Sequence, residues 1–461
     1  MSSCSSIKSN HQPSLEYLKH TPSQYYQDSN LHIEYAPKSD TIFLFGGLTT
    51  IQDRVIESAL QSLNINAISL ENATFRAYEL GKIYGNKAQC NPTYFTVGNL
   101  IKYLLHLRDE QKIPTEEIIK KYAYITAGGC GPCRFGMYVT EYKKALRDAG
   151  FDGFRVTSFE HDKGIFQGED REDTLIEYSP KFFITLIKAV IIGDLLNIKA
   201  HKIRPYEIDS GETNRALEHS TQIISEAFKN HSSLLLALYK CRKIFQKVEI
   251  DSKIKKPKVL ITGEFWASLT DGDGNYNLHK FLEEQGAEVI PQPVLNRLML
   301  SIWESSYNNS LKKDIYRGKN IDISYTKERI LLAMAKYSIK TFVSLYSKAL
   351  YLKDFKLVDV EKLASLAKDY YPLECSGGEG HMEVAHLLEN IKYNIANLVI
   401  SVKPFGCMPS SAVSDGIQSL IVSKYPEANF LSIETSGEGA TNFYSRVQMA
   451  LFKAKEQFKL D

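Results

Sequence analysis

The sequence predicts an α/β protein with two lobes, each built on a parallel β-sheet, and a helical section between them. Short apolar runs that end at glycine alternate with segments of helical periodicity near both ends of the chain. From about residue 180 to residue 248 the pattern is helical alone. The 461 residues are enough for two or three separate cores without disulfide support.

The first lobe is expected at residues 36–165, after a polar tail at residues 1–35 in which no clear period is found. Its first strand is followed at once by Gly46 and Gly47, and this strand–glycine–helix order is typical of parallel sheets. We expect strands at 41–45, 66–70, 122–127 and 154–158, and helices at 51–63, 96–107 and 138–148.

The helical connecting section is expected at residues 166–255 and the second lobe at residues 256–461. The most apolar helix, 182–198, contains Lys188 and Asp194, which would be costly inside a bilayer, so we expect it to be buried in protein. In the second lobe we expect strands at 258–262, 288–291, 398–402 and 429–433, and helices at 278–285, at 412–424 and near the end.

Composition restricts the class of protein. The 56 basic and 54 acidic residues nearly cancel, so the net charge does not favour binding to nucleic acid or to an anionic membrane. No secretory signal is recognisable at residues 1–10, which favours a cytoplasmic location. In a reducing compartment the seven cysteines are candidates for metal ligands or redox thiols.

The cysteines fall into two groups. Cys241 lies in an apolar helical run and is expected to pack as a small hydrophobic residue, and Cys4 lies in the tail. The others lie in turns rich in glycine, proline or asparagine, and they are Cys90, Cys130, Cys133, Cys375 and Cys407. Two of these turns follow predicted strands, and ligands of open parallel sheets bind at the carboxyl ends of strands.

Three chemistries fit the spacing of Cys130 and Cys133. An iron–sulfur cluster needs thiolates from several directions, with glycines that let the backbone approach sulfur. The Cys-Gly-Pro-Cys sequence is also that of thioredoxin-like dithiol oxidoreductases, although here it follows two glycines in a much longer chain. Zinc could be bound by this pair together with Cys375 and Cys407, although a second Cys-x-x-Cys pair is missing.

Other motifs give weaker signals. The glycine runs at 377–380 and 437–439 lack a P-loop ending, so ATP binding is not expected. The segment 271–275 resembles the start of a calcium loop but lacks the glutamate at position twelve, which favours a polar turn. Glu379, His381 and Glu383 follow Cys375 and form either a proton-donor or ligand group or a solvated helix start.

Several segments together resemble a known family. The stretch Gly128–Tyr138, with Gly85–Pro92 before it, resembles the 2-hydroxyacyl-CoA dehydratase D-component-like proteins that are related to CoA-substrate-specific enzyme activases. The resemblance covers roughly residues 40 to 455, and it also includes the segments 204–207, 263–266, 271–275, 401–409 and 444–446.

The resemblance implies two Rossmann-like lobes that bind a 4Fe-4S cluster or a double-cubane cluster. It implies Cys90, Cys130 and Cys407 as the first ligands and Cys133 and Cys375 as the next. It also implies that a separate actin/Hsp70-type ATPase activator supplies low-potential electrons, which the protein passes to an unknown substrate or partner. The protein could be a dehydratase-like component or a reductase component. Its substrate could be a small molecule or a CoA thioester, and it could form a dimer.

Overall fold

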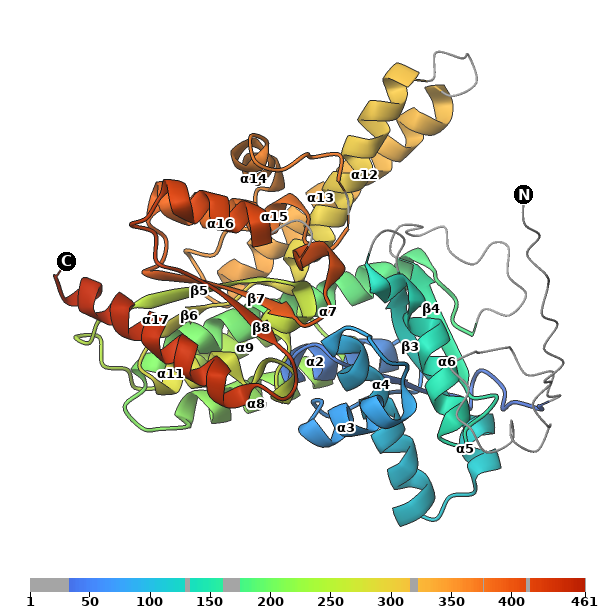
Figure 1. Cartoon of the computed structure of the whole chain (residues 1–461). Helices are drawn as coiled ribbons and strands as arrows, with labels where there is room; N and C mark the ends of the chain where they lie inside the picture. Colours follow the sequence, from blue (N-terminus) through green and yellow to red (C-terminus); the bar gives the residue numbers. More distant parts are fainter. Residues whose placement is uncertain are drawn as a thin grey trace, which may run out of the picture.

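The computed structural model describes residues 33–128, 133–160, 175–315, 322–375, 377–411 and 415–460. The strands form two four-stranded sheets in which every pairing is parallel. Helices surround both sheets (Figure 1). The predicted α/β class, with a parallel sheet in each lobe and helices between them, is confirmed. The tail at 1–32 and Cys130 lie outside the described residues.

The N-terminal sheet has the strand order β2-β1-β3-β4. Its strands are β1 (Ile42–Phe45), β2 (Ala67–Ser69), β3 (Tyr122–Gly128) and β4 (Arg155–Glu160), close to the predicted positions. The helices of this lobe are α2 (Thr50–Gln61), α3 (Phe75–Tyr84), α4 (Asn91–Leu105), η1 (His106–Glu110), α5 (Thr115–Lys121), η2 (Arg134–Met137) and α6 (Tyr138–Asp148). The prediction missed α3, and it began α4 five residues late, at residue 96.

The C-terminal sheet repeats this topology with the order β6-β5-β7-β8. Its strands are β5 (Lys258–Gly263), β6 (Glu288–Ile290), β7 (Leu398–Pro404) and β8 (Phe430–Thr435). The accompanying helices are α10 (Phe265–Leu269), η5 (Asp273–Asn275), α11 (Leu278–Glu284), α14 (Val360–Ala367), α15 (His381–Tyr393), α16 (Asp415–Lys424) and α17 (Ala440–Leu460). In each sheet the first strand lies inside, so the strand order reverses beside it, and such reversal points are where ligands bind in open sheets.

The middle section consists of α7 (Pro180–Ile203), η4 (Arg204–Tyr206), α8 (Glu212–Lys229) and α9 (Leu234–Phe245). The apolar helix α7 is buried along much of its length, as predicted. Its side chains belong to one large core together with residues of α2, α12 and α15. This large core joins the middle section to both lobes, and each lobe also has a smaller core of its own.

Two long helices, α12 (Val294–Ile315) and α13 (Asp322–Ala349), were not predicted from the sequence. They run side by side and project from the rest of the molecule (Figure 1). Ile330, Met334 and Tyr337 on α13 are exposed.

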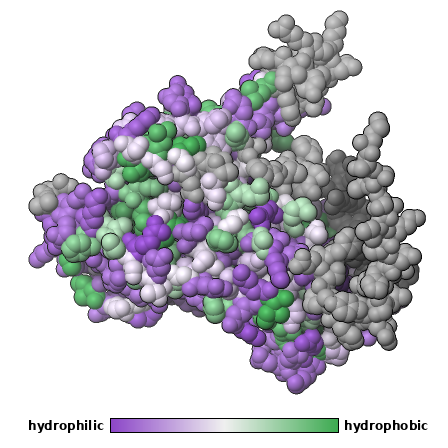
Figure 2. All heavy atoms as spheres, in the orientation of Figure 1, coloured by the Kyte–Doolittle hydropathy of each residue, from purple (hydrophilic) through white to green (hydrophobic). Residues whose placement is uncertain are grey.

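In Figure 2 most of the visible face is hydrophilic, with small hydrophobic patches between the polar residues. Within the described residues no helix has the length and apolar character needed to cross a membrane.

A buried carboxylate links three parts of the chain. Asp194, in the middle of α7, accepts hydrogen bonds from the backbone N–H groups of Val294 and Leu295, both at 2.9 Å. The Gln52 side chain of α2 donates a third hydrogen bond to it at 2.6 Å. These donors belong to the N-terminal lobe and to the start of α12, so Asp194 fixes both relative to the middle section.

We expect Asp194→Ala to destabilise the protein by about 2–5 kcal/mol, because it leaves buried N–H donors without an acceptor. The free energy of unfolding in urea measures this loss. Glu218→Ala is the control, because it removes an exposed ion pair with Arg54 and should cost less than about 0.5 kcal/mol. Equal losses for the two variants would show that Asp194 does not join these parts.

Candidate functional site

The reversal points of the two sheets face each other across the lobe interface. Trp266, from the turn after β5, packs against Phe95 of α4 with ring centroids 5.7 Å apart. A Cβ atom on Gly47, in the turn after β1, would lie 3.7 Å from the Trp266 indole nitrogen. Asp271 accepts a hydrogen bond from the Thr50 N–H at 2.9 Å. The segments 263–266 and 271–275 therefore contact the other lobe and form part of the lobe interface. The predicted polar turn at 271–275 includes the short helix η5.

Cys90 is the N-cap residue of α4 and is buried. Its position depends on close packing of α3 on α4, since a Cβ atom on Gly98 would lie 1.7 Å from the Ala77 carbonyl oxygen. The Cys90 sulfur lies 3.0 Å from the hydroxyl of Tyr138 and 3.1 Å from that of Thr93. Two hydroxyl groups are thus placed to donate to a thiolate at this position.

The Cys90 turn meets the Cys407 turn of the other lobe. The N–H of Asn91 donates to the carbonyl of Phe405 at 3.0 Å. Gly406 has a φ of +75°, and a Cβ atom there would lie 3.4 Å from the Cys90 Cα atom. Cys407 is buried and follows β7 directly. The turns that carry these two cysteines, far apart in the sequence, are therefore in backbone contact between the lobes.

A glutamate lies among the cysteine turns. Glu264 follows β5, and its carboxylate accepts a hydrogen bond from the Ala267 N–H at 2.9 Å. Burial, together with this carboxylate, raises the pKa of Cys133 to about 11. The same two causes raise the pKa of the Cys407 thiol. Glu264 is thus an acidic neighbour shared by thiols of both lobes, and burial raises its own pKa. Sequence reasoning did not single it out.

Cys375 lies at the edge of this region. It is exposed, and its backbone carbonyl accepts a hydrogen bond from the Tyr371 hydroxyl at 2.9 Å. The following loop reaches the Cys407 turn, since a Cβ atom on Gly378 would lie 2.6 Å from the Pro409 Cβ atom. Cys241 is buried in α9, as expected for a packing residue.

The structure brings part of the predicted ligand set together. Cys90 and Cys133 interact electrostatically, and the Cys90 turn contacts that of Cys407. Cys130 lies in the gap at 129–132, outside the described residues. Within the described ranges, no three His, Cys, Asp or Glu side chains are arranged to hold a metal ion.

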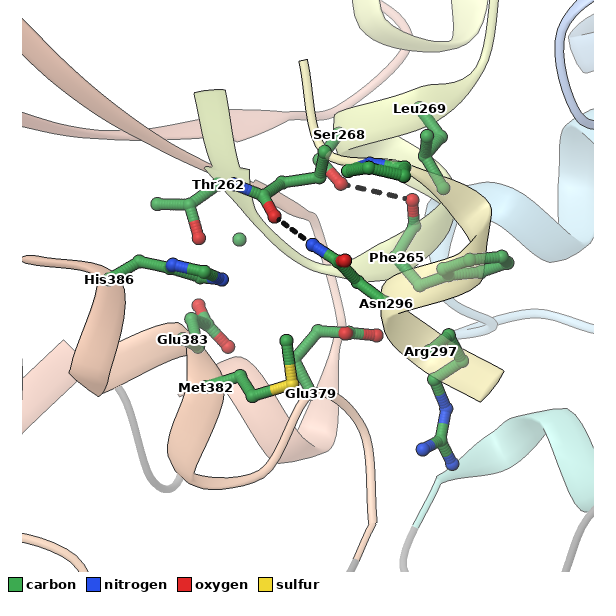
Figure 3. Close-up of a pocket in the computed structure, with 13 residues that line it drawn as sticks. Thr262, Phe265, Ser268, Leu269, Asn296, Arg297, Glu379, Met382, Glu383 and His386 are labelled. Carbon is green, nitrogen blue, oxygen red and sulfur yellow. Dashed lines mark hydrogen bonds between the residues drawn. The ribbon is translucent and has the colours of Figure 1, made fainter. Parts of the chain in front are cut away.

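A small polar cavity lies beside the cysteine turns, between β5, α12 and α15. Its volume of about 20 Å³ is sufficient for one water molecule. Figure 3 shows His386, Glu383 and Asn296 around this space, with Glu379 beside them. The His386 Nε2 atom is buried and has no hydrogen-bond partner among the described residues. The cavity therefore has a ring nitrogen, carboxylates and an amide on its walls.

The acids at this cavity have unusual environments. Burial raises the pKa of Glu379 to about 8, the Arg297 guanidinium opposes this, and the carboxylates of Glu264 and Glu383 reinforce it. Glu383 is buried and accepts a hydrogen bond from the Ser410 hydroxyl at 3.2 Å. A mainly protonated carboxylic acid is thus held near the cysteines at neutral pH.

One of the two sequence interpretations of this segment is correct only in part. The helix α15 does begin at His381, but His381 and Glu383 are buried, so this helix start is not solvated. His381 packs edge-on against Trp303, with ring centroids 4.5 Å apart, and burial lowers its pKa to about 4. His386 and Asn296, which sequence reasoning missed, complete the cavity. No local pattern marks them, because the two residues lie 90 positions apart in the sequence, on helices α12 and α15.

The comparisons with known proteins add no relative. No family model matches the chain, and no curated protein matches it.

We expect Gly263→Ala to disturb this site. Gly263 has a φ of +117°, and a Cβ atom there would lie 2.1 Å from the Val402 carbonyl oxygen, which also accepts the Glu264 N–H. Strain and overlap together should cost roughly 2–4 kcal/mol of the unfolding free energy, measured in urea.

Gly416→Ala is the matched control, because Gly416 lies in α16 with no atom within 4 Å of the added Cβ. It should be neutral or stabilise the protein by up to about 1 kcal/mol. A Gly263→Ala variant as stable as the control would contradict the close packing of β5 on β7.

Proposed function

We propose that this protein holds an iron–sulfur cluster with cysteines of both lobes, and that it passes electrons from a separate ATPase activator to a substrate or partner. The observation that supports this most directly is the Asn91 to Phe405 hydrogen bond, which places the Cys90 and Cys407 turns side by side. The electron source and the activator follow from the family resemblance of the sequence.

The chemistry of the donor set suits such a cluster, although the described cysteines are not arranged as a group of three metal ligands. Cys90, Cys133 and Cys407 would be ligands, with Cys130 in the adjoining segment and Cys375 at the rim. The Tyr138 and Thr93 hydroxyls lie within 3.1 Å of the Cys90 sulfur and would donate to it as a thiolate. Burial and Glu264 raise the pKa of Cys133 and of Cys407, so a bound cation would be needed to favour their thiolate forms at neutral pH.

When bound, the cluster would supply one-electron transfer at low potential. The protein contributes charge and protons around it. A carboxylate at Glu264 opposes the addition of an electron nearby and so favours a low reduction potential. Glu379 keeps its proton at neutral pH and lines the cavity, so it can act as a general acid toward a reduced substrate through a water molecule held there.

The dithiol alternative would use Cys130 as the attacking thiol, the cysteine whose pKa is lowered at a helix N-terminus in such motifs. A dithiol of Cys130 and Cys133 does not require Cys407 of the other lobe, so a Cys407 variant distinguishes the two alternatives. The zinc alternative uses the same thiols, and metal analysis distinguishes it from iron.

We expect Cys90→Ser and Cys407→Ser each to lose most of the iron and sulfide after anaerobic reconstitution, because each removes a thiolate from a different lobe. Iron and acid-labile sulfide assays with absorption spectra measure this. Cys241→Ser is the control and should keep its iron, since Cys241 is buried in α9. A wild-type protein that binds no iron, or binds zinc instead, would overturn the proposal.

We expect Tyr138→Phe to keep the iron but to lower the reduction potential, because it removes a hydroxyl that lies 3.0 Å from the Cys90 sulfur. Redox titration followed by electron paramagnetic resonance measures this. Tyr142→Phe serves as control, since the Tyr142 hydroxyl pairs with that of Tyr124 at 3.2 Å. Equal potentials in all three proteins would argue against Cys90 as a ligand.

A further inference from the structure

A second pocket lies at the opposite end of the C-terminal sheet from the cysteine turns. It is formed where the middle section enters β5, and its volume is about 410 Å³, within the range of small-molecule sites. Lys258 begins β5 and pairs with Glu288, which begins β6, so the pocket lies at the amino ends of the strands. Cys407 follows the carboxyl end of β7. The pocket is therefore separate from the candidate cluster site.

Four lysines line this pocket: Lys202, Lys255, Lys256 and Lys258. In the part of the chain that the structure describes, none of their ammonium groups forms an ion pair with a carboxylate. Lys202 lies in the last turn of α7, where it also offsets the negative end of the helix dipole. The three other lysines lie on or next to the extended segment that leads into β5. No helix dipole accounts for their positive charges at these positions.

The carboxylates near this pocket already accept hydrogen bonds from other groups of the protein. Asp251 lines the pocket, and its carboxylate accepts a hydrogen bond from the Lys253 N–H at 2.9 Å. The carboxylate of Glu288 accepts one from the Tyr206 hydroxyl at 2.7 Å. Four ammonium groups and one carboxylate line the pocket, which leaves a strong positive charge. Such a concave positive surface attracts anions.

The pocket walls are fixed by backbone hydrogen bonds. The Asp251 N–H donates to the Tyr206 carbonyl at 2.8 Å, and the Ile208 N–H donates to the Glu249 carbonyl at 3.0 Å. The Lys258 N–H donates to the Asn397 side chain at 2.9 Å. Because these bonds hold the segment between η4 and β5, the pocket exists without a ligand, and binding would require little ordering of the backbone.

The same pocket has apolar and aromatic walls. Tyr206 and Phe458 line it, and Ile250 and Ile254 line it with about half of their surface exposed. An inorganic anion would use the lysines but leave these walls in water. A ligand that joins a phosphate to a ring would use both.

We propose that this pocket binds a phosphorylated small molecule with an aromatic ring, of the nucleoside diphosphate type. The phosphates lie among the four lysines, and the ring packs against Tyr206 and Phe458. Its distance from the cysteine turns, at the other end of the strands, makes it a second site that does not depend on the proposed cluster. Either proposal can therefore fail without the other.

Isothermal titration calorimetry of the full chain with ADP tests this. We expect saturable binding that weakens as salt is raised, with weaker binding of pyrophosphate and of adenosine alone. Lys255→Gln/Lys256→Gln should weaken ADP binding by about tenfold or more, because it removes two cations from the pocket that form no ion pair with a carboxylate, although the Lys256 ammonium lies 5.8 Å from the centre of the Tyr206 ring. Phe458→Ala should weaken the binding of ADP but not that of pyrophosphate.

The matched control is Lys120→Gln/Lys121→Gln, which removes the same charge from two adjacent exposed positions in α5 of the N-terminal lobe, outside the pocket. It should change ADP binding by less than about threefold, because screened surface charges act weakly at a distance. Equal urea midpoints for both double variants confirm that the fold is intact. Absence of saturable ADP binding, equal losses in both double variants, or binding to phosphatidylserine vesicles without ADP binding would each overturn the proposal.

Discussion

The burial of one carboxylate determines how the parts of this protein fit together. Asp194 lies inside the large shared core, where an unpaired charge would be unstable, and it is stabilised by donors from α2 and from the start of α12. A small displacement of either lobe would remove a donor from it. The relative placement of the lobes is therefore tied to the requirement that a buried polar group be satisfied.

This placement has a chemical consequence. With both lobes fixed to the middle section, the reversal points of the two sheets face each other, and the turns that carry Cys90 and Cys407 meet. The same geometry brings Glu264 and the protonated Glu379 close to the thiols. Burial at this meeting of the lobes is also the main cause of the raised pKa values of Cys133, Cys407 and Glu379.

Local patterns were sufficient to predict most strands. An apolar run that ends at glycine identifies a parallel strand because the strand is buried on both faces and the turn needs a flexible residue. The helices α3, α12 and α13 were missed, since residues such as Met334 and Tyr337 are exposed and blur the apolar face. Because α4 was predicted to begin at residue 96, the sequence did not reveal that Cys90 is the N-cap residue of this helix.

The sequence by itself determined the fold class and marked Cys90, Cys133 and Cys407 as turn residues next to glycine or proline, because these are properties of neighbouring residues. Only the tertiary structure decided that Cys90 adjoins Cys407, that Glu264 faces thiols of both lobes, and that lysines from α7 and from the start of β5 line one pocket. Distances between residues hundreds of positions apart depend on how helices pack around a shared core, which local patterns do not encode.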